Sequence, residues 1–179
     1  IYADLGRIWY EKLHRDRNAL SSWELVLDID PGNTEALSAI AAIHRAAANN
    51  SDLVETLHRI VDVGAGTLEP RVLEGVWLEL GALYTQKLKQ PSDAVDAYNK
   101  ALEVNPGNFS ALDALEAIHS ANEDWLACVE VKQRRANALS EPRDKIVVLL
   151  DMASMWNEKL DDPARAAEPL NQILEADPL

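Results

Sequence analysis

The chain has 179 residues, of which 47% are hydrophobic and 26% charged, and its formal net charge is −13. This apolar content is enough for the core of one soluble domain or a short repeat array, which argues against a disordered chain. Charged residues interrupt every apolar stretch, so no membrane insertion is expected. The acidic balance argues against nucleic-acid binding, because phosphate contacts need clustered Lys and Arg.

The first predicted element begins at Tyr2, where large and small residues follow the i, i+3, i+4, i+7 spacing of one helix face. The spacing occurs three times, at Tyr2, Leu5, Gly6 and Trp9, at Trp77, Leu80, Gly81 and Tyr84, and at Leu149, Met152, Ala153 and Trp156. A second apolar series with a closing proline follows each set, namely Ala19, Trp23, Val26 and Pro31, then Ala94, Tyr98, Ala101 and Pro106, then Ala166, Leu170, Ile173 and Pro178. The distance to the closing proline is the same in all copies (31−2, 106−77, 178−149). Three helix hairpins of one pattern are therefore predicted.

Two variant units lie between these copies, after the matching turns Pro31-Gly32-Asn33 and Pro106-Gly107-Asn108. Aligned at Ala36 and Ala111, they place the unit starts at residues 2, 36, 77, 111 and 149. The predicted fold is all-α, with about five hairpins and about ten helices in a single repeat domain. The expected hairpins span about 1–31, 32–63, 70–106, 107–139 and 143–178.

Several local features carry their own expectations. The stretch VDVGAGTLEPR (61–71) is the longest expected connection and the expected hinge. Pro169 should kink or shorten the last helix, because it removes a hydrogen bond. Cys128 is the single cysteine, which excludes an internal disulfide and favours a small packed side chain. The basic cluster KQRR (132–135) is expected to form one solvated turn of helix.

The third unit, which begins at Trp77, resembles the tetratricopeptide repeat (TPR), whose pattern is W-x2-L-G-x2-Y, then A-x3-F, then P. WLELGALY, AVDAY and Pro106 match this pattern, with one extra residue in the turn KLKQPSD. The first unit exchanges its two aromatics, the fifth has Leu149 and Ala153, and the variant units match mainly in their spacing. The resemblance implies an α-solenoid that forms a right-handed superhelix, with first helices lining a concave surface that binds peptides or other proteins. It also implies that the Trp77 motif packs between hairpins.

Candidates for catalysis are few. His44 and His119 occupy equivalent places in the variant units, but no two histidines have the spacing and adjacent Glu of a metalloprotease site. Carboxylate pairs such as Asp161-Asp162 and Glu123-Asp124 lie at turns, where helix capping explains them. We therefore predict a non-enzymatic protein with no cofactor and no metal. The two histidines are expected to be structural, with groove contact as the alternative.

Two series of residues are predicted to face the groove. In the five units, the residue directly after the first motif position is Ala3, Leu37, Leu78, Leu112 and Leu150. The residue that follows it is Asp4, Ser38, Glu79, Asp113 and Asp151. The candidate partner-binding residues are Leu37, Leu78, Glu79, Leu112, Asp113, Leu150, Asp151, His44 and His119. A peptide or amphipathic segment with apolar and basic residues would suit this surface. The alternative is a structural array or oligomerisation spacer whose leucines pack internally and whose groove binds no ligand.

Neither end of the sequence carries the polar cap that solenoids usually need, and LEADPL stops where another repeat would begin. The expectation is a segment of a longer repeat protein, or a homo-oligomer formed through the uncapped ends. No targeting segment is visible at the start, although a removed signal peptide stays open. The compartment is not determined, with a cytoplasmic location slightly favoured.

Overall fold

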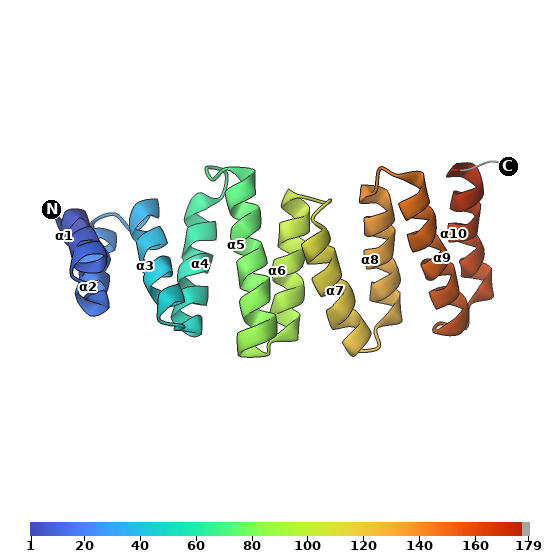
Figure 1. The fold of residues 1–179 in the computed structure, drawn as a ribbon, viewed down its shortest axis with the longest axis horizontal. Coiled ribbons are helices and arrows are strands. Elements are labelled where there is room, and N and C mark those ends of the chain that lie inside the picture. Colours follow the sequence, from blue (N-terminus) through green and yellow to red (C-terminus); the bar gives the residue numbers. More distant parts are fainter. Residues whose placement is uncertain (177–179) are drawn as a thin grey trace. The chain divides into compact units, whose positions relative to one another are not determined.

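A computed structural model describes residues 1–176, and over this range the chain consists of helices without a strand (Figure 1). Pro178, the expected end of the fifth hairpin, lies outside the described residues. The α-helices are α1 (Tyr2–Arg7), α2 (Asp16–Ile29), α3 (Thr34–Ala46), α4 (Asn50–Gly64), α5 (Pro70–Leu83), α6 (Pro91–Val104), α7 (Phe109–Ala121), α8 (Trp125–Ala138), α9 (Pro142–Glu158) and α10 (Pro163–Ala176). Two π-helical turns, η1 (Ile8–Lys12) and η2 (Tyr84–Leu88), extend α1 and α5. The all-α prediction is confirmed.

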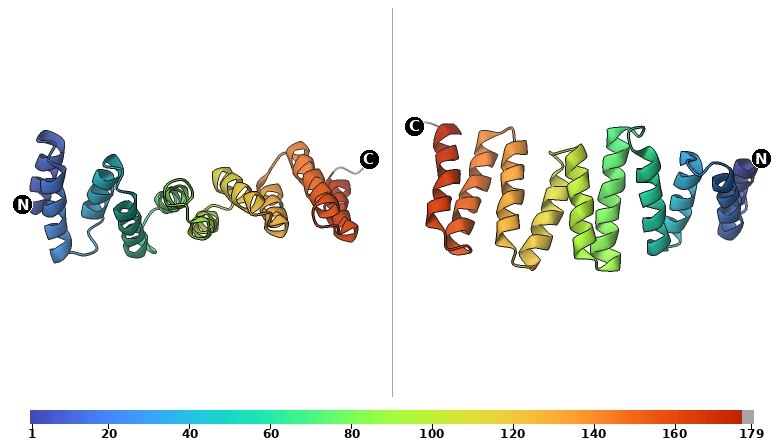
Figure 2. Two further views of the ribbon diagram at one scale, coloured as in Figure 1. Left: turned by 90° about the horizontal axis from the view of Figure 1, so that it is seen from below. Right: turned by 180° about the vertical axis from the view of Figure 1, so that it is seen from behind.

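The chain divides into two compact units, residues 1–90 and the part that begins at Pro91. In the first unit α2 packs on α1 and α3, and α4 packs on α3 and α5. In the second unit each helix from α6 to α10 packs on the next one in sequence. Successive helices within a unit lie side by side in all views (Figures 1 and 2). The unit boundary falls between α5 and α6, inside the expected hairpin 70–106.

Every turn between a first and a second helix contains one residue in the left-handed region. These residues are His14, Ala48, Lys89, Glu123 and Asp161, with φ between 50° and 58°. The N–H of the following residue then bonds to a carbonyl near the end of the first helix, as in a Schellman-type stop. The carbonyls that accept these bonds belong to Trp9, His44, Tyr84, His119 and Trp156. The turn thus ends each first helix at an equivalent residue.

The π-helical turns account for the extra residue predicted in KLKQPSD. Gln90 N–H bonds to the Tyr84 carbonyl six residues earlier, and Arg15 N–H bonds likewise to Trp9. In the second hairpin the corresponding bond, from Asn49 to His44, spans only five residues. A π turn adds one residue to a helix turn. The first and third hairpins therefore keep the same stop signal while being one residue longer. In the fifth hairpin the bond from Asp162 N–H to the Trp156 carbonyl also spans six residues, there without a π-helical turn.

The PGN turns separate one hairpin from the next, as predicted, and their asparagines cap the helix that follows. Asn33 Oδ1 accepts a hydrogen bond from Ala36 N at 3.0 Å, and Asn108 Oδ1 accepts one from Ala111 N at 2.9 Å. Each bond satisfies a backbone donor that the first helical turn leaves free. The capping explanation also holds for Asp124, whose carboxylate accepts from Ala127 N at 3.2 Å.

Two local expectations need correction. The connection between α4 and α5 is the longest between the described helices, as predicted, but α4 continues through Gly64 and α5 begins at Pro70, so it is about half as long as the predicted 61–71 segment. Helix α10 runs through Pro169 and has 14 residues, the same length as α6, so the proline does not shorten it. The Pro169 ring is fully buried, and this burial offsets part of the lost hydrogen bond.

Candidate protein-binding surface

The first series predicted to face the groove, from Ala3 to Leu150, does not form a continuous exposed apolar surface. Leu37 and Leu112 are fully buried, Leu78 is half-buried, and only Leu150 is well exposed, at 50%. Leu37 and Leu112 are therefore core residues that no groove ligand contacts, which corrects the prediction for these two positions.

The cause is a register error of one residue in the variant units. The carbonyls that close the hairpin turns belong to His44 and His119, which places these histidines at the position of Tyr84. Counting back seven residues aligns Leu37 and Leu112 with Trp77, the first residue of the packing motif. Buried Ile40 and Leu115 then take the place of Leu80, so the variant units carry the same packing face as the others.

The motif that resembles the TPR is a packing face in the first unit. Leu80 is fully buried, while Trp77 and Tyr84 are half-buried. The His58 ring, on α4, meets the Trp77 ring edge-on with centroids 6.1 Å apart, and its Nε2 lies 2.8 Å from the Tyr84 hydroxyl. Trp77 of α5 and Tyr84 of η2 thus both contact the second helix of the preceding hairpin.

The acidic side chains predicted to face the groove form ion pairs with basic side chains of the same chain. Arg45 on α3 donates from Nε to Glu79 Oε1 at 2.6 Å and from Nη2 to Glu79 Oε2 at 2.8 Å. In the second unit, Arg135 pairs with Asp113 and Lys132 pairs with Asp151. These carboxylates stay partly exposed, but their charge is already compensated locally.

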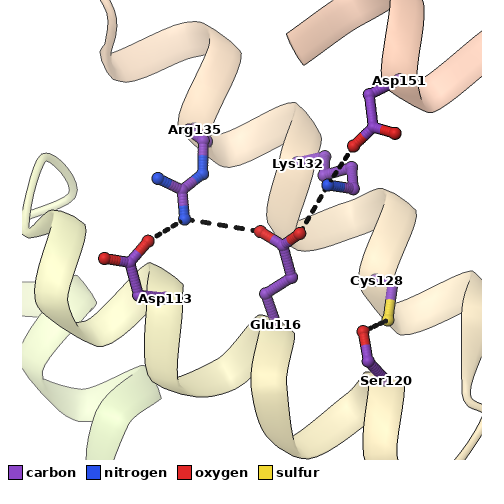
Figure 3. A network of polar contacts seen from close by, with 7 residues as sticks. All are labelled: Asp113, Glu116, Ser120, Cys128, Lys132, Arg135 and Asp151. Atoms are coloured by element: carbon purple, nitrogen blue, oxygen red, sulfur yellow. Dashed lines mark hydrogen bonds and ion pairs between the residues drawn. The ribbon is translucent and has the colours of Figure 1, made fainter.

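Figure 3 shows that the pairs of the second unit form one network across three helices. Asp113 and Glu116 come from α7, Lys132 and Arg135 from α8, and Asp151 from α9. Lys132 Nζ lies 2.5 Å from both Glu116 Oε1 and Asp151 Oδ2, and Arg135 reaches Glu116 Oε2 at 3.4 Å. Three carboxylates and two bases leave one net negative charge. The network ties α7, α8 and α9 together.

The prediction of a solvated turn at KQRR was wrong, because Lys132 is buried with 7% of its surface exposed. Burial alone would lower the pKa of Lys132, since it disfavours the ammonium form. Hydrogen bonds to Asp151 and Glu116 outweigh burial, so the pKa of Lys132 is raised above its usual value. The side chain is a charged connection between helices, not a free basic site.

His44 and His119 are half-buried, each in a shallow hollow of its own unit. His44 lies with Glu24, Asp52 and Glu55 around about 320 Å³, and its Nδ1 is 3.8 Å from Asp52 Oδ2. His119 Nδ1 is 3.6 Å from Asp124 Oδ2. Both distances exceed hydrogen-bond length. Among the described residues, no group of three or more His, Cys, Asp or Glu side chains is arranged to hold a metal ion.

Cys128 packs inside the second unit as a fully buried side chain. Its Sγ lies 3.4 Å from Ser120 Oγ, which is within reach of a weak hydrogen bond to sulfur. The expected packing role of this cysteine agrees with its position.

The exposed apolar residues of the second unit include two on α9. Val147 is 65% exposed and Leu150 50% exposed, three residues apart and therefore on one side of the helix. They adjoin Asp151 and thus the ion network. A hollow of about 340 Å³, lined by Asp113, Glu116, Ala117 and Ser120, opens on α7. We call these seven residues the α7–α9 face.

The described part of the chain contains no helix whose length and apolar character would let it cross a membrane. No protein-family model matches the sequence, and no curated protein matches it.

Solved structures do match the fold. A MamA crystal structure is 18% identical, with a TM-score of 0.56 over 98% of this chain and 89% of that one. YrrB, described as a TPR protein with an unusual peptide-binding site, is 14% identical, with a TM-score of 0.55 over 99% and 85%. MamA from Desulfovibrio magneticus RS-1 is 15% identical, with a TM-score of 0.53 over 98% and 92%. The chain therefore has the fold of a tetratricopeptide-repeat α-solenoid, as the WLELGALY motif predicted.

Proposed function

We propose that the chain is a non-enzymatic scaffold that binds a segment of another protein on the first-helix surface of its second unit. The observation that carries the proposal is the α7–α9 face, where Val147 and Leu150 are exposed on α9 and the neighbouring Asp151 is linked through Lys132 to Glu116, which lines a hollow on α7. Apolar side chains grouped on a soluble protein often mark a partner site. Peptide binding by a similar fold, as described for YrrB, supports the proposal.

The charge of the α7–α9 face indicates how many basic residues the partner segment should carry. Because Lys132 and Arg135 already compensate two of the three carboxylates, one net negative charge remains for the partner. A helix with apolar anchors and one or two basic residues fits this surface better than a strongly basic peptide. The net charge of −13 still favours encounter with cationic partners over longer distances.

The test uses a photo-crosslinking amino acid at position 150, followed by mass spectrometry of the products. The matched control places the same amino acid at position 126, because Leu126 is 52% exposed on the second helix α8. We expect a specific product at 150 only, and loss of that product when Val147 is changed to Asp. Equal products at both positions would contradict the proposal.

The alternative is a structural array whose first-helix surface binds no ligand. The ion pairs that link Glu79 to α3 and Asp151 to α8 favour it, since they show acidic positions used for internal cohesion. It predicts no specific crosslink at position 150. The candidate contacts Leu78, Glu79, His44 and His119 remain proposals for partner contact, to be tested in the same way.

A further inference from the structure

We propose that a hollow between the second helices α6 and α8 binds an extended segment of a partner protein, through one carboxylate side chain with apolar side chains beside it. The hollow has a volume of about 700 Å³ and lies within the second unit. Leu102 of α6, Pro106 of the following turn and Ala138 of α8 form its apolar wall. Ligand pockets have this size and combine an apolar lining with a few polar groups. The site is separate from the α7–α9 face, whose residues lie on first helices.

The charges at the hollow favour an anionic ligand. Glu103 and Arg134 both line it, but Lys100 Nζ donates to the two carboxylate oxygens of Glu103 at 2.8 and 3.0 Å and so compensates that charge. Arg134 is exposed, and within the described part of the chain it pairs with no carboxylate. It donates one hydrogen bond, from Nη1 to Asn99 Oδ1 at 2.7 Å. Because a guanidinium group has five N–H donors in a planar fork, most of them stay open to a ligand carboxylate.

Two asparagines at the hollow are held so that they donate hydrogen bonds to a ligand. Asn99 Oδ1 accepts from Arg134, and Asn137 Oδ1 accepts from Gln133 Nε2 at 3.1 Å. With both oxygens engaged, the NH2 group is the part of each amide that a ligand can use, and it needs an acceptor.

These donors define the ligand further. Arg134 fits a carboxylate, and the two NH2 groups fit backbone carbonyls on either side of it, which an internal peptide segment provides. The net charge of −13 disfavours encounter with a strongly acidic segment. A segment with a single carboxylate therefore fits this site best.

The equivalent place in the first unit shows that a side chain can fill this space. The offset of 75 between the PGN turns (106−31) places Val63 at the position of Ala138. A Cβ atom added at Gly32 would lie 3.6 Å from Val63 Cγ1. One added at Gly107 would meet, among the described atoms, Asn105 Oδ1 alone within 4 Å. The small side chain of Ala138 thus leaves open a space that Val63 occupies in the first unit.

The polar residues of the hollow also differ between the units. With the same offset, Glu24 stands at the position of Asn99 and Asp62 at the position of Asn137. Two carboxylates thus replace two donors in the first unit. A carboxylate ligand should therefore bind in the second unit and be repelled from the equivalent place in the first.

The test uses the peptide acetyl-Gly-Leu-Glu-Leu-Gly-amide, which is titrated into the isotope-labelled chain and followed by NMR. We expect saturable shifts of the backbone signals of Gly107 and Ala138 and of the side-chain NH2 signals of Asn99 and Asn137. Signals of Gly32 should not shift. Changing the central Glu of the peptide to Gln should weaken binding about three- to fivefold, the size of a partly exposed charge pair. Changing both leucines of the peptide to glycine should weaken it further.

Variants of the chain locate the site. Arg134→Gln should weaken binding about three- to fivefold, whereas Arg143→Gln, which removes the same charge from an exposed residue of α9, should have no effect. Ala138→Val should abolish binding with unchanged circular dichroism, because the fold already carries valine at the equivalent place. Val147→Asp, which tests the α7–α9 face, should leave the shifts unchanged, so failure of one proposal is distinguishable from failure of the other.

Three results would overturn the proposal: no saturable shifts at these signals, equal affinity for the Glu and Gln peptides, or full affinity of Ala138→Val. Tighter binding of acetyl-Gly-Leu with a free terminal carboxylate would also overturn it, because the ligand would then be a chain end and not an internal segment.

Discussion

Replacing Gly6 with alanine tests how closely α1 lies against α2. A Cβ atom at Gly6 would lie 2.6 Å from Trp23 Cε2, 2.7 Å from Nε1 and 2.9 Å from Cδ2. Carbon atoms in good contact are about 3.5–4.0 Å apart, so the helix or the indole must move by about 1 Å. Trp23 is buried with 2% exposure, and its rigid ring has little room to turn.

Overpacking of this kind costs about 1–3 kcal/mol, from which about 1 kcal/mol is regained because alanine favours helix over glycine. Because all three short contacts involve a rigid and buried ring, the overpacking cost should lie in the upper part of that range, about 2–3 kcal/mol, so we expect Gly6→Ala to destabilise the first hairpin by about 1–2 kcal/mol. Gly75→Ala is the matched control, because Gly75 lies exposed in α5 and a Cβ atom added there would meet no atom within 4 Å, and it should stabilise by about 0.5–1 kcal/mol. Amide exchange in α1 and α2 and urea unfolding followed by circular dichroism measure both variants. Equal or greater stability of Gly6→Ala would refute the close approach.

Three further variants test the turns, the network and the corrected register. Ala48→Gly should stabilise by about 0.5–1 kcal/mol in thermal unfolding because φ is 56° at this residue, whereas Ala47→Gly, at φ −80°, should destabilise. Lys132→Met should cost about 1–2 kcal/mol at pH 7, measured by urea unfolding, since it leaves Glu116 and Asp151 less compensated. Because the pKa of Lys132 is raised in the folded state, this stabilisation is complete below the unfolded-state pKa of about 10.4 and is lost as the pH rises through the folded-state pKa. The free energies of unfolding of wild type and Lys132→Met should therefore converge at high pH. Leu112→Asp should unfold the second unit by circular dichroism, whereas Leu150→Asp should leave helicity unchanged.

Local signals predicted the helices well. The Trp77 motif, the PGN turns and the asparagine caps each act within a few residues, so their spacing is readable in the sequence. The register of the variant units was missed because Ala36 and Leu37 are both apolar and buried, which leaves the pattern of spacing ambiguous. The distance from the capping asparagine does not resolve it, because Ala36 and Ala111 also lie at one fixed distance from Asn33 and Asn108, and Trp77 and Leu149 lie eight residues after their own N-caps.

Tertiary contacts explain the errors at the candidate site. Lys132 is buried because Glu116, sixteen residues earlier, and Asp151, nineteen residues later, meet it from neighbouring helices. Read alone, KQRR is a hydrophilic segment, and nothing in its composition distinguishes the buried lysine from exposed Arg134. The exposure of Val147 and Leu150 likewise depends on which side of α9 packs on α8 and α10.

The burial of Lys132 has a consequence for behaviour in concentrated electrolyte. Mobile ions weaken attraction between water-exposed groups such as Lys100 and Glu103, whose side chains are 51% and 63% exposed. They screen the buried ammonium group of Lys132 far less. As ionic strength rises, the ion pair between α8 and α9 should therefore keep most of its strength while exposed ion pairs weaken, so the loss of stability should differ along the chain.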